Sequence, residues 1–156
     1  MIESNISIED FKNSAGTVLG PSEWLLIDQE RINRFADATD DYQFIHVDPE
    51  KAAETSFGCT IAHGFLSLSI LPHLLSQILP IPDGLVMGIN YGVDKVRFSQ
   101  PVKVNSRVRA TARVERVSAR SGGQFMVRTR VTLEIENRQR PAVVAHMLSL
   151  YVVESD

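Results

Sequence analysis

An acidic side chain and an imidazole lie five residues apart in the segment 40–49, which reads DDYQFIHVDP. Histidine, whose unperturbed pKa is about 6.5, can take up or release a proton near neutral pH. An aspartate beside it can orient the ring or share in proton transfer. Addition of water to a double bond needs both a proton acceptor and a proton donor, so Asp41 and His46 are candidates for that chemistry. The same spacing is also compatible with a solvated loop aspartate and a packed histidine.

A second group of residues, GCTIAHGF at 58–65, opens the longest apolar stretch of the chain. A buried helix that begins here has backbone N–H groups without helical acceptors and a partial positive charge. Glycine allows another group to approach the backbone closely. An enolate oxygen formed from a thioester carbonyl would be stabilised at such a place. The alternative is that the glycine is present because nothing larger packs there.

These residues must be positioned by helices and strands that the sequence pattern predicts. The pattern is helical before about residue 83 and strand-like after it. Helices are predicted at 7–13, after Asp28 and after Asp48-Pro49, and a short strand at 24–27. The polar stretch 37–43 ends the second helix. Asp41 and His46 are therefore expected in a loop between helices, where both side chains can turn toward one point. The stretch 61–79 predicts the longest helix, central because it is apolar on most sides, and kinked or broken at Pro72.

The second half of the chain alternates apolar and polar residues as strands do. Segments 107–115 and 125–136 follow this pattern, and the residues 121–123 between them, Ser-Gly-Gly, indicate a hairpin. Segments 84–91 and 95–98 predict two short strands. The nearly all-apolar segment 142–153 predicts a strand covered on both faces or near a subunit contact. About five antiparallel strands would wrap the central helix in an α+β architecture.

Composition fits one globular domain over residues 1–156, with 44% hydrophobic and 22% charged residues. A net charge of −3 argues against a general nucleic-acid binder. The single cysteine excludes an intramolecular disulfide. Residues 1–10 lack the pattern of a secretory signal, and polar residues interrupt 61–79, so no membrane span is expected. These features predict a cytoplasmic protein with no membrane or nucleic-acid partner.

Residues 38–65 together resemble the MaoC-like dehydratases, the (R)-specific enoyl-CoA hydratases of hot-dog fold, and especially their NodN-like single-domain branch. The motif of that family runs G-D-x-N-P-[LIV]-H-x-D, with [AV]-H-G about eighteen residues past the histidine. Asp41, Ile45, His46 and Asp48 match it, and Ala62-His63-Gly64 follows at the expected distance. The resemblance extends from about Glu23 to Val153, including the segments 90–92, 95–98 and 101–102.

The resemblance implies a single hot-dog domain in which an antiparallel sheet wraps a central apolar helix. It implies reversible (R)-specific hydration of trans-2-enoyl-CoA to (R)-3-hydroxyacyl-CoA, with Asp41 and His46 activating the water. The N–H of Gly64 would form the oxyanion hole. No metal or redox cofactor is implied, and the sheets of two copies would join edge to edge in a homodimer.

Six further residues are candidates for binding the acyl-CoA thioester. Lys95 and Arg97 would neutralise coenzyme A phosphates. The other candidates for lining the pocket are His63, Phe44, Asn90 and Tyr91.

The remaining histidines and a possible metal site are not expected to take part in the chemistry. His73 and His146 lie in apolar surroundings and are expected to be packed. A metal site built from Asp41, His46, Asp48 and His63 is not expected, because these residues form no ligand pair on one helix face.

Three departures from the motif matter. Asp40 stands where glycine is usual, Gln43 replaces asparagine and Phe44 replaces proline. The additional charge of Asp40 is expected to raise the proton affinity of both catalytic groups, and Phe44 to narrow the acyl tunnel. A non-catalytic acyl-thioester binder of the same fold therefore stays open. A thioesterase of this fold would carry a carboxylate on the central helix, and the sequence has no Asp or Glu between Glu54 and Asp83.

Overall fold

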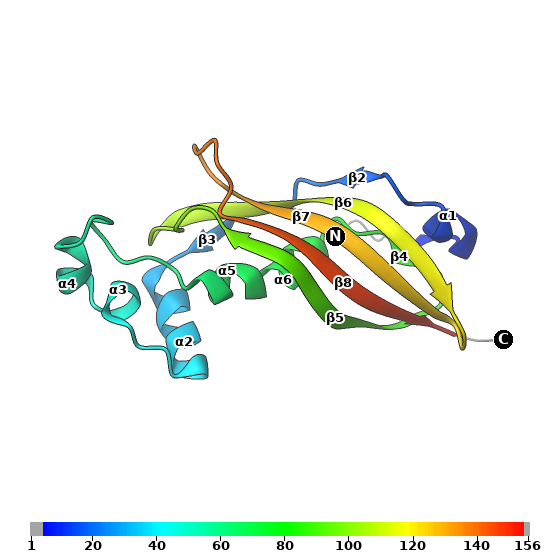
Figure 1. The fold of residues 1–156 in the computed structure, drawn as a ribbon, viewed down its shortest axis with the longest axis horizontal. Helices are drawn as coiled ribbons and strands as arrows, with labels where there is room; N and C mark the ends of the chain where they lie inside the picture. The colour runs from blue at the N-terminus through cyan, green and yellow to red at the C-terminus, as the bar shows by residue number, and fades with distance from the viewer. Residues whose placement is uncertain (1–4, 155–156) are drawn as a thin grey trace.

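A computed structural model describes residues 5–154, in which a curved antiparallel sheet is accompanied by short helices (Figure 1). The expected absence of a leader at residues 1–10 concerns in part residues 1–4, which lie outside the described residues. In chain order the elements are β1 (Asn5–Ile6), α1 (Ile8–Lys12), β2 (Val18–Leu19), β3 (Leu25–Ile27), α2 (Gln29–Thr39), α3 (Phe44–Val47), α4 (Pro49–Ala53), α5 (Gly64–Ser69), α6 (Leu71–Leu75), β4 (Ile81–Pro82), β5 (Leu85–Phe98), β6 (Ser106–Arg120), β7 (Gln124–Ile135) and β8 (Val143–Val153).

The main sheet has the strand order β2-β6-β7-β8-β5, and β3 also pairs with β6. The predicted hairpin at 121–123 joins β6 and β7, whose register runs from Val108 opposite Ile135 to Arg120 opposite Gln124. The prediction of two short strands at 84–91 and 95–98 is wrong, because β5 is one strand of 14 residues. A bulge between Asp94 and Arg97, in which Lys95 has a φ of 49°, absorbs the break in the pattern.

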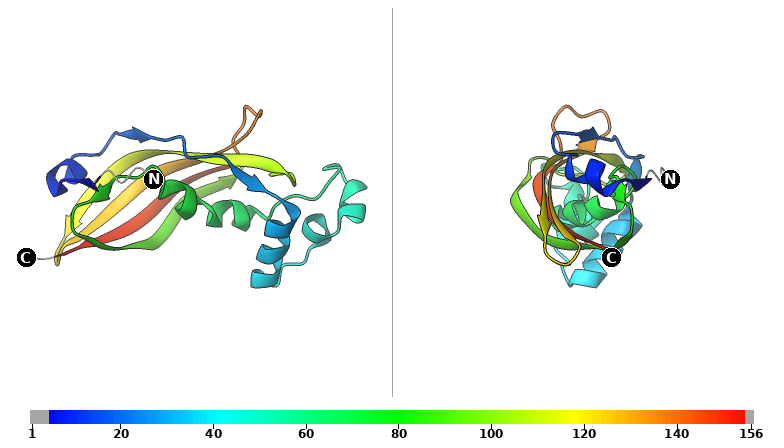
Figure 2. Two further views of the ribbon diagram at one scale, coloured as in Figure 1. Left: turned by 180° about the vertical axis from the view of Figure 1, so that it is seen from behind. Right: turned by 90° about the vertical axis from the view of Figure 1, so that its right-hand side faces the viewer.

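Helices α5 and α6 lie in the concavity of the sheet, as the end-on view in Figure 2 shows. Leu71 and Leu74 are fully buried there. The predicted start of the helix at Ile61 is wrong: Ile61 forms a β-bridge with Lys103, and the N–H of Ala62 donates to the Val102 carbonyl at 2.7 Å. Of the two outcomes expected at Pro72, the helix stops and restarts, at Ile70. The core around it includes Val108, Ala110, Val131, Leu133, Val143 and Ala145.

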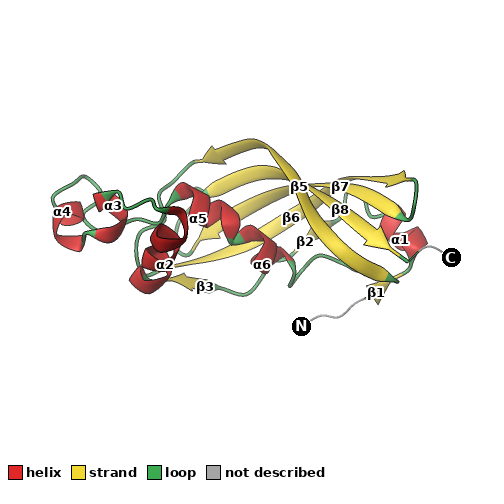
Figure 3. Cartoon of the chain, turned by 90° about the horizontal axis from the view of Figure 1, so that it is seen from below, coloured by secondary structure: helices red, strands yellow, loops and turns green. Residues whose placement is uncertain are grey.

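Side-chain caps begin three of the helices as the sequence predicts. Ser7 accepts from the N–H of Asp10 at the start of α1, and Asp28 accepts from that of Arg31 at the start of α2. Asp48 caps α4. Helices α2, α3 and α4 extend beyond the end of the sheet at which α5 begins (Figure 3). The segment that contains Asp41 and His46 is therefore presented to the first turn of the buried helix.

The prediction that His73 and His146, two histidines outside this region, are packed is wrong. His73 is exposed on α6. His146 lies on the outer face of β8 and bonds through Nδ1 to the Glu115 carboxylate at 2.8 Å. The reason is that the apolar residues around both of them face inward, whereas the imidazoles face away from the core.

The arrangement confirms the predicted α+β fold, a hot-dog fold whose antiparallel sheet encloses a central apolar helix. Among residues 5–154, no helix has the length and apolar character needed to cross a membrane.

Candidate active site

The segment from Asp40 to Val47 turns sharply after α2. Asp40 ends that helix in the left-handed conformation, with a φ of 57°. Asp41 lies in the following loop, as predicted, but His46 lies in α3, a single helical turn, and not in the loop. The N–H of His46 donates to the Gln43 carbonyl at 2.9 Å, and that of Asp48 to the Phe44 carbonyl at 3.0 Å. One turn of helix is too short to show as periodicity in the sequence.

The extended segment Thr60–His63 holds this turn in place by three hydrogen bonds. The N–H of Ile61 donates to the Ile45 carbonyl at 3.0 Å. The Ile61 carbonyl is 2.7 Å from Nδ1 of His46, and Nε2 of His63 is 2.9 Å from the Asp41 carbonyl. A carbonyl oxygen can only accept, so both ring nitrogens carry the proton and donate. The segment that precedes the buried helix thus fixes both candidate residues.

These contacts leave Nε2 of His46 without a proton and free to act as a base. His46 is buried, with 7% of its surface exposed. Burial lowers the pKa of His46 below its ordinary value of 6.5 and dominates the opposing effects of the Ile61 hydrogen bond and the Asp41 charge, while His63 lowers it further. Asp40, which was expected to raise the proton affinity of this histidine, is not among the groups that shift its pKa, and the net shift is downward. At neutral pH the ring is an uncharged acceptor.

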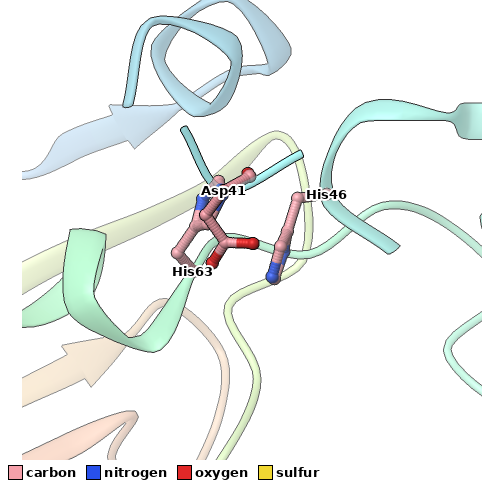
Figure 4. Close-up of side chains that lie close together, drawn as sticks. All are labelled: Asp41, His46 and His63. Carbon is pink, nitrogen blue, oxygen red and sulfur yellow. The ribbon is translucent and has the colours of Figure 1, made fainter. Parts of the chain in front are cut away.

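Asp41, His46 and His63 meet at one point, and Figure 4 shows the Asp41 carboxylate directed toward the His46 ring. One nitrogen or carboxylate oxygen of each lies within 4.8 Å of those of the others. Two acceptors at that separation can both be reached by one water molecule with hydrogen bonds of about 2.8 Å. Asp41 is exposed, so the water has access from solvent. The site can hold a water molecule and remove its proton.

The same three residues could also be read as metal ligands, but their geometry does not suit an ion. The His46 and His63 rings are stacked, with centroids 3.8 Å apart and an interplanar angle of 26°. The lone pair of an imidazole nitrogen lies in the plane of its ring, so nearly parallel rings direct their lone pairs side by side and not to one centre. The arrangement favours proton transfer by His46.

Two residues that the sequence analysis missed complete the support of His46. Nε2 of Gln29 donates to the His46 carbonyl at 2.7 Å and to Oδ1 of Asn33 at 2.9 Å. The hydroxyl of Thr60, which is 1% exposed, donates to Oε1 of Gln29 at 2.5 Å. Gln29 therefore links α2, the His46 backbone and the segment Thr60–His63. The sequence gives no signal for it, since the partners lie 17 and 31 positions away.

Gly64 is the first residue of α5, directly after His63. The N–H of a first helical residue has no acceptor within its helix and can bind another group. A Cβ at this position would lie 3.1 Å from the Phe98 ring, so a larger residue would require that ring to shift. Phe98, a further residue that the sequence did not reveal, also contacts Phe65 with ring centroids 5.8 Å apart. Both aromatic rings are largely exposed at this side of Gly64.

A groove runs from α5 and α6 to β5 and β8. It consists of two hollows of about 260 Å³ and 370 Å³ that share Pro72, Asn90 and Met147. Tyr91 lines the second hollow, whereas Phe44 lies elsewhere, beside a hollow lined with Lys51, Glu54 and Thr55. The lining is mostly apolar, from Leu68 beside the site to Leu75, Leu79, Ile81 and Tyr151 at the far end.

Lys95 and Arg97 are exposed on β5 close to Phe98. Nη1 of Arg97 donates to the carbonyl of its neighbour Val96 at 2.8 Å, and the side chain otherwise extends into solvent. Neither residue lines the two hollows of the groove, whose lining on β5 extends only to Val93.

Comparison with known proteins gives one consistent result. A family model described as MaoC like domain matches residues 10–137. The chain is 47% identical over 146 residues to 3-hydroxyacyl-thioester dehydratase Z of Mycobacterium tuberculosis, which covers 94% of this chain and 96% of that protein. It is 46% identical over 146 residues to Nodulation protein N of Rhizobium leguminosarum, covering 93% and 91%. The solved (R)-hydratase from A. caviae superposes with a TM-score of 0.67 at 25% identity, covering 86% of this chain and 94% of that one.

Replacement of Gln29 by leucine tests the support of His46. The change leaves the buried Thr60 hydroxyl and the His46 carbonyl without their partners. We expect the free energy of unfolding in urea to fall by about 2 kcal/mol or more. The control Asn33→Ala removes only the exposed contact of the same glutamine and should change stability by less than about 0.5 kcal/mol. Equal losses in the two variants would contradict the assignment.

Titration of His46 tests its protonation state. Folding lowers the pKa of His46, so protonation of this histidine favours the unfolded chain. The free energy of unfolding is therefore not reduced by His46 above pH 6.5, and it decreases as the pH falls from 6.5 through the pKa of the folded protein. NMR titration should place the midpoint of His46 below 6.5. The variant His46→Gln, which also assigns the signal, should show a weaker loss of stability in acid. A midpoint at or above 6.5 would show that burial does not control the ring.

Proposed function

Because the chain belongs to the MaoC-like domain family, we propose that it is a hydro-lyase that reversibly adds water to trans-2-enoyl-CoA to form (R)-3-hydroxyacyl-CoA. The observation that carries the proposal is that a carboxylate oxygen of Asp41 lies within 4.8 Å of a ring nitrogen of His46, whose Nδ1 proton is held by the Ile61 carbonyl. The names of its relatives, a 3-hydroxyacyl-thioester dehydratase and an (R)-hydratase, describe the same type of reaction and support it.

The first step uses His46 as the base. Nε2 of His46 removes one proton from the water, while the other O–H of the water donates a hydrogen bond to the Asp41 carboxylate. The water oxygen forms a bond to C3 of the substrate, and the electrons of the double bond move to the thioester carbonyl. The resulting enolate oxygen accepts a hydrogen bond from the N–H of Gly64, the first residue of α5.

The second step returns the proton to carbon. The protonated His46 ring, destabilised by its burial, delivers its Nε2 proton to C2 as the enolate collapses to the thioester. The new hydroxyl at C3 still donates a hydrogen bond to the Asp41 carboxylate. Since one ring accepts and delivers the proton from one side, hydrogen and hydroxyl enter on the same face. One water is consumed, and both side chains return to their starting states.

The groove supports an acyl-CoA as the substrate. Its apolar lining begins at Leu68, about one helical turn past Gly64, and continues along α5 and α6 for the acyl chain. Asn90 and Tyr91 line the wall formed by β5. Lys95 and Arg97 lie farther along the same strand toward Phe98, where cations would meet coenzyme A phosphates. His63 is buried and is not suited to direct contact with the substrate.

The exposed edge of β5 supports the homodimer. Within the described residues this strand pairs with β8 on one side, and its other edge is open. Val86, Met87, Ile89, Tyr91 and Val93 are each at least 43% exposed along it. A long apolar edge strand is prone to pair with another chain, and a second copy related by two-fold symmetry can pair the two β5 edges.

Hydration of crotonyl-CoA, followed as loss of enoyl absorbance, tests the function and the two side chains together. Asp41→Asn and His46→Gln should each reduce kcat about 10²- to 10⁴-fold, because His46 transfers the proton and Asp41 orients the water that gives it up. The matched control Asp40→Asn removes a charge beside Asp41, retains a residue that tolerates the left-handed conformation, and should keep near-full activity. A wild type that binds enoyl-CoA without hydrating any chain length would instead indicate the non-catalytic binder. An active enzyme insensitive to either substitution would refute the assigned roles.

Light scattering after size exclusion tests the dimer. Lysines at Val86 and Met87 place charges on the open edge without altering residues that line the groove. We expect the double variant Val86→Lys/Met87→Lys to be monomeric at micromolar concentration, whereas the wild type is a dimer. Val18→Lys, at an exposed apolar position on β2 at the opposite side of the sheet, should leave the dimer intact. A monomeric wild type would exclude the β5 interface.

A further inference from the structure

His63 lies behind the proposed catalytic residues and contacts the elements that carry each of them. It is 2% exposed. Its ring stacks on that of His46 at 3.8 Å, and Phe35 of α2 lies against it at 5.0 Å with an angle of 55° between the rings. Gly64 follows it directly in the chain. His63 is thus enclosed between α2, α3 and the start of the buried helix.

The hydrogen bond from His63 ties down the loop that carries Asp41. Nε2 of His63 donates to the Asp41 carbonyl at 2.9 Å. By contrast, the Asp41 carboxylate accepts the N–H of Gln43 at 3.4 Å, which is a weak contact on an exposed side chain. The backbone of Asp41 is therefore held mainly from the side of His63.

The second ring nitrogen of His63 indicates that aromatic packing alone does not explain a histidine at this position. Nδ1 is buried and has no hydrogen-bond partner among the described residues. Burying a polar nitrogen without a hydrogen-bond partner opposes folding. A phenylalanine would stack between Phe35 and His46 without that disadvantage. The feature of histidine that is used here is the Nε2–H bond to Asp41.

We infer that His63 is a positioning residue that holds the Asp41 carboxylate at water-bridging distance from Nε2 of His46, in the same frame as the N–H of Gly64. The inference rests on the proposed function for its effect on rate. Its structural content, the bond from His63 to the Asp41 carbonyl, stands independently of any activity.

Three substitutions separate the hydrogen bond from the stacking. The amide of glutamine can occupy the position of Nε2 and donate to the Asp41 carbonyl, whereas that of asparagine is too short. Phenylalanine retains the stacking and loses the bond. We expect His63→Phe and His63→Asn to reduce kcat for crotonyl-CoA hydration about 100-fold with little change in KM, because the carboxylate is misplaced and substrate binding is not. His63→Gln should retain kcat to within a few-fold.

Two readouts make the outcome decisive. The backbone amide of Tyr42 belongs to the same peptide group as the Asp41 carbonyl, so its NMR shift should change in the Phe and Asn variants and not in the Gln variant, whether or not the protein is active. His73→Phe and His73→Gln, at an exposed histidine on α6, are matched controls that should change neither readout. Gln and Asn variants that behave alike, or a Phe variant with wild-type kcat, would overturn the inference. A wild type without hydratase activity, but with the expected amide shifts, would overturn the proposed function and leave the bond established.

Discussion

The hydrogen bond between Nδ1 of His46 and the Ile61 carbonyl is the interaction on which the chemistry of the site depends. It decides which ring nitrogen carries the proton, and so presents the bare Nε2 to Asp41. Burial lowers the pKa of the same ring, which favours the uncharged form that the proposed base requires. Because Asp41 is exposed and His46 is buried, the site lies at the boundary between core and solvent. The proposed mechanism uses this boundary, with water entering from the Asp41 side and meeting His46 on the other.

The Ile61 carbonyl is fixed in turn by the fold. The segment Thr60–His63 is anchored to the chain between β5 and β6, where the N–H of Ala62 donates to Val102 and that of Val104 to Thr60. It continues into α5, and the helix pair is held in the sheet by fully buried side chains such as Leu71 and Leu74, each worth about 1.5–3 kcal/mol. Hydrophobic burial of the central helix therefore sets the geometry of a polar site that lies beyond its first turn.

The sequence allowed prediction of what local pattern controls. Capping residues such as Asp28 and Asp48 marked helix starts, and the alternation of β6 and β7 together with the glycines between them marked a hairpin. The errors arose where tertiary contacts decide. Residues 61 and 62 are apolar enough for a helix but are drawn into pairing with 102 and 103. Gln29 escaped notice because it acts through a backbone carbonyl, which any residue provides, and a hydroxyl 31 positions away.

The departures from the family motif separate positions that serve the backbone from positions that serve chemistry. Asp40 occupies a left-handed helix end, which explains why glycine is usual there and why aspartate is tolerated. Phe44 is the first residue of a helical turn, a position that proline favours, and it points away from the groove. Gln43 precedes that turn and makes no side-chain cap. These changes leave the Asp41–His46 space untouched.

The polar groups behind that space argue further against a chain that kept the fold without a use for the site. His46, Thr60 and His63 are all buried beside an apolar core, and Nδ1 of His63 is unpaired. Buried polar groups of this kind are less favourable than apolar residues of similar volume unless something other than stability maintains them. Since His46 and His63 converge with the exposed Asp41, and Thr60 supports His46 through Gln29, the proposed handling of a water molecule gives one reason for their presence together.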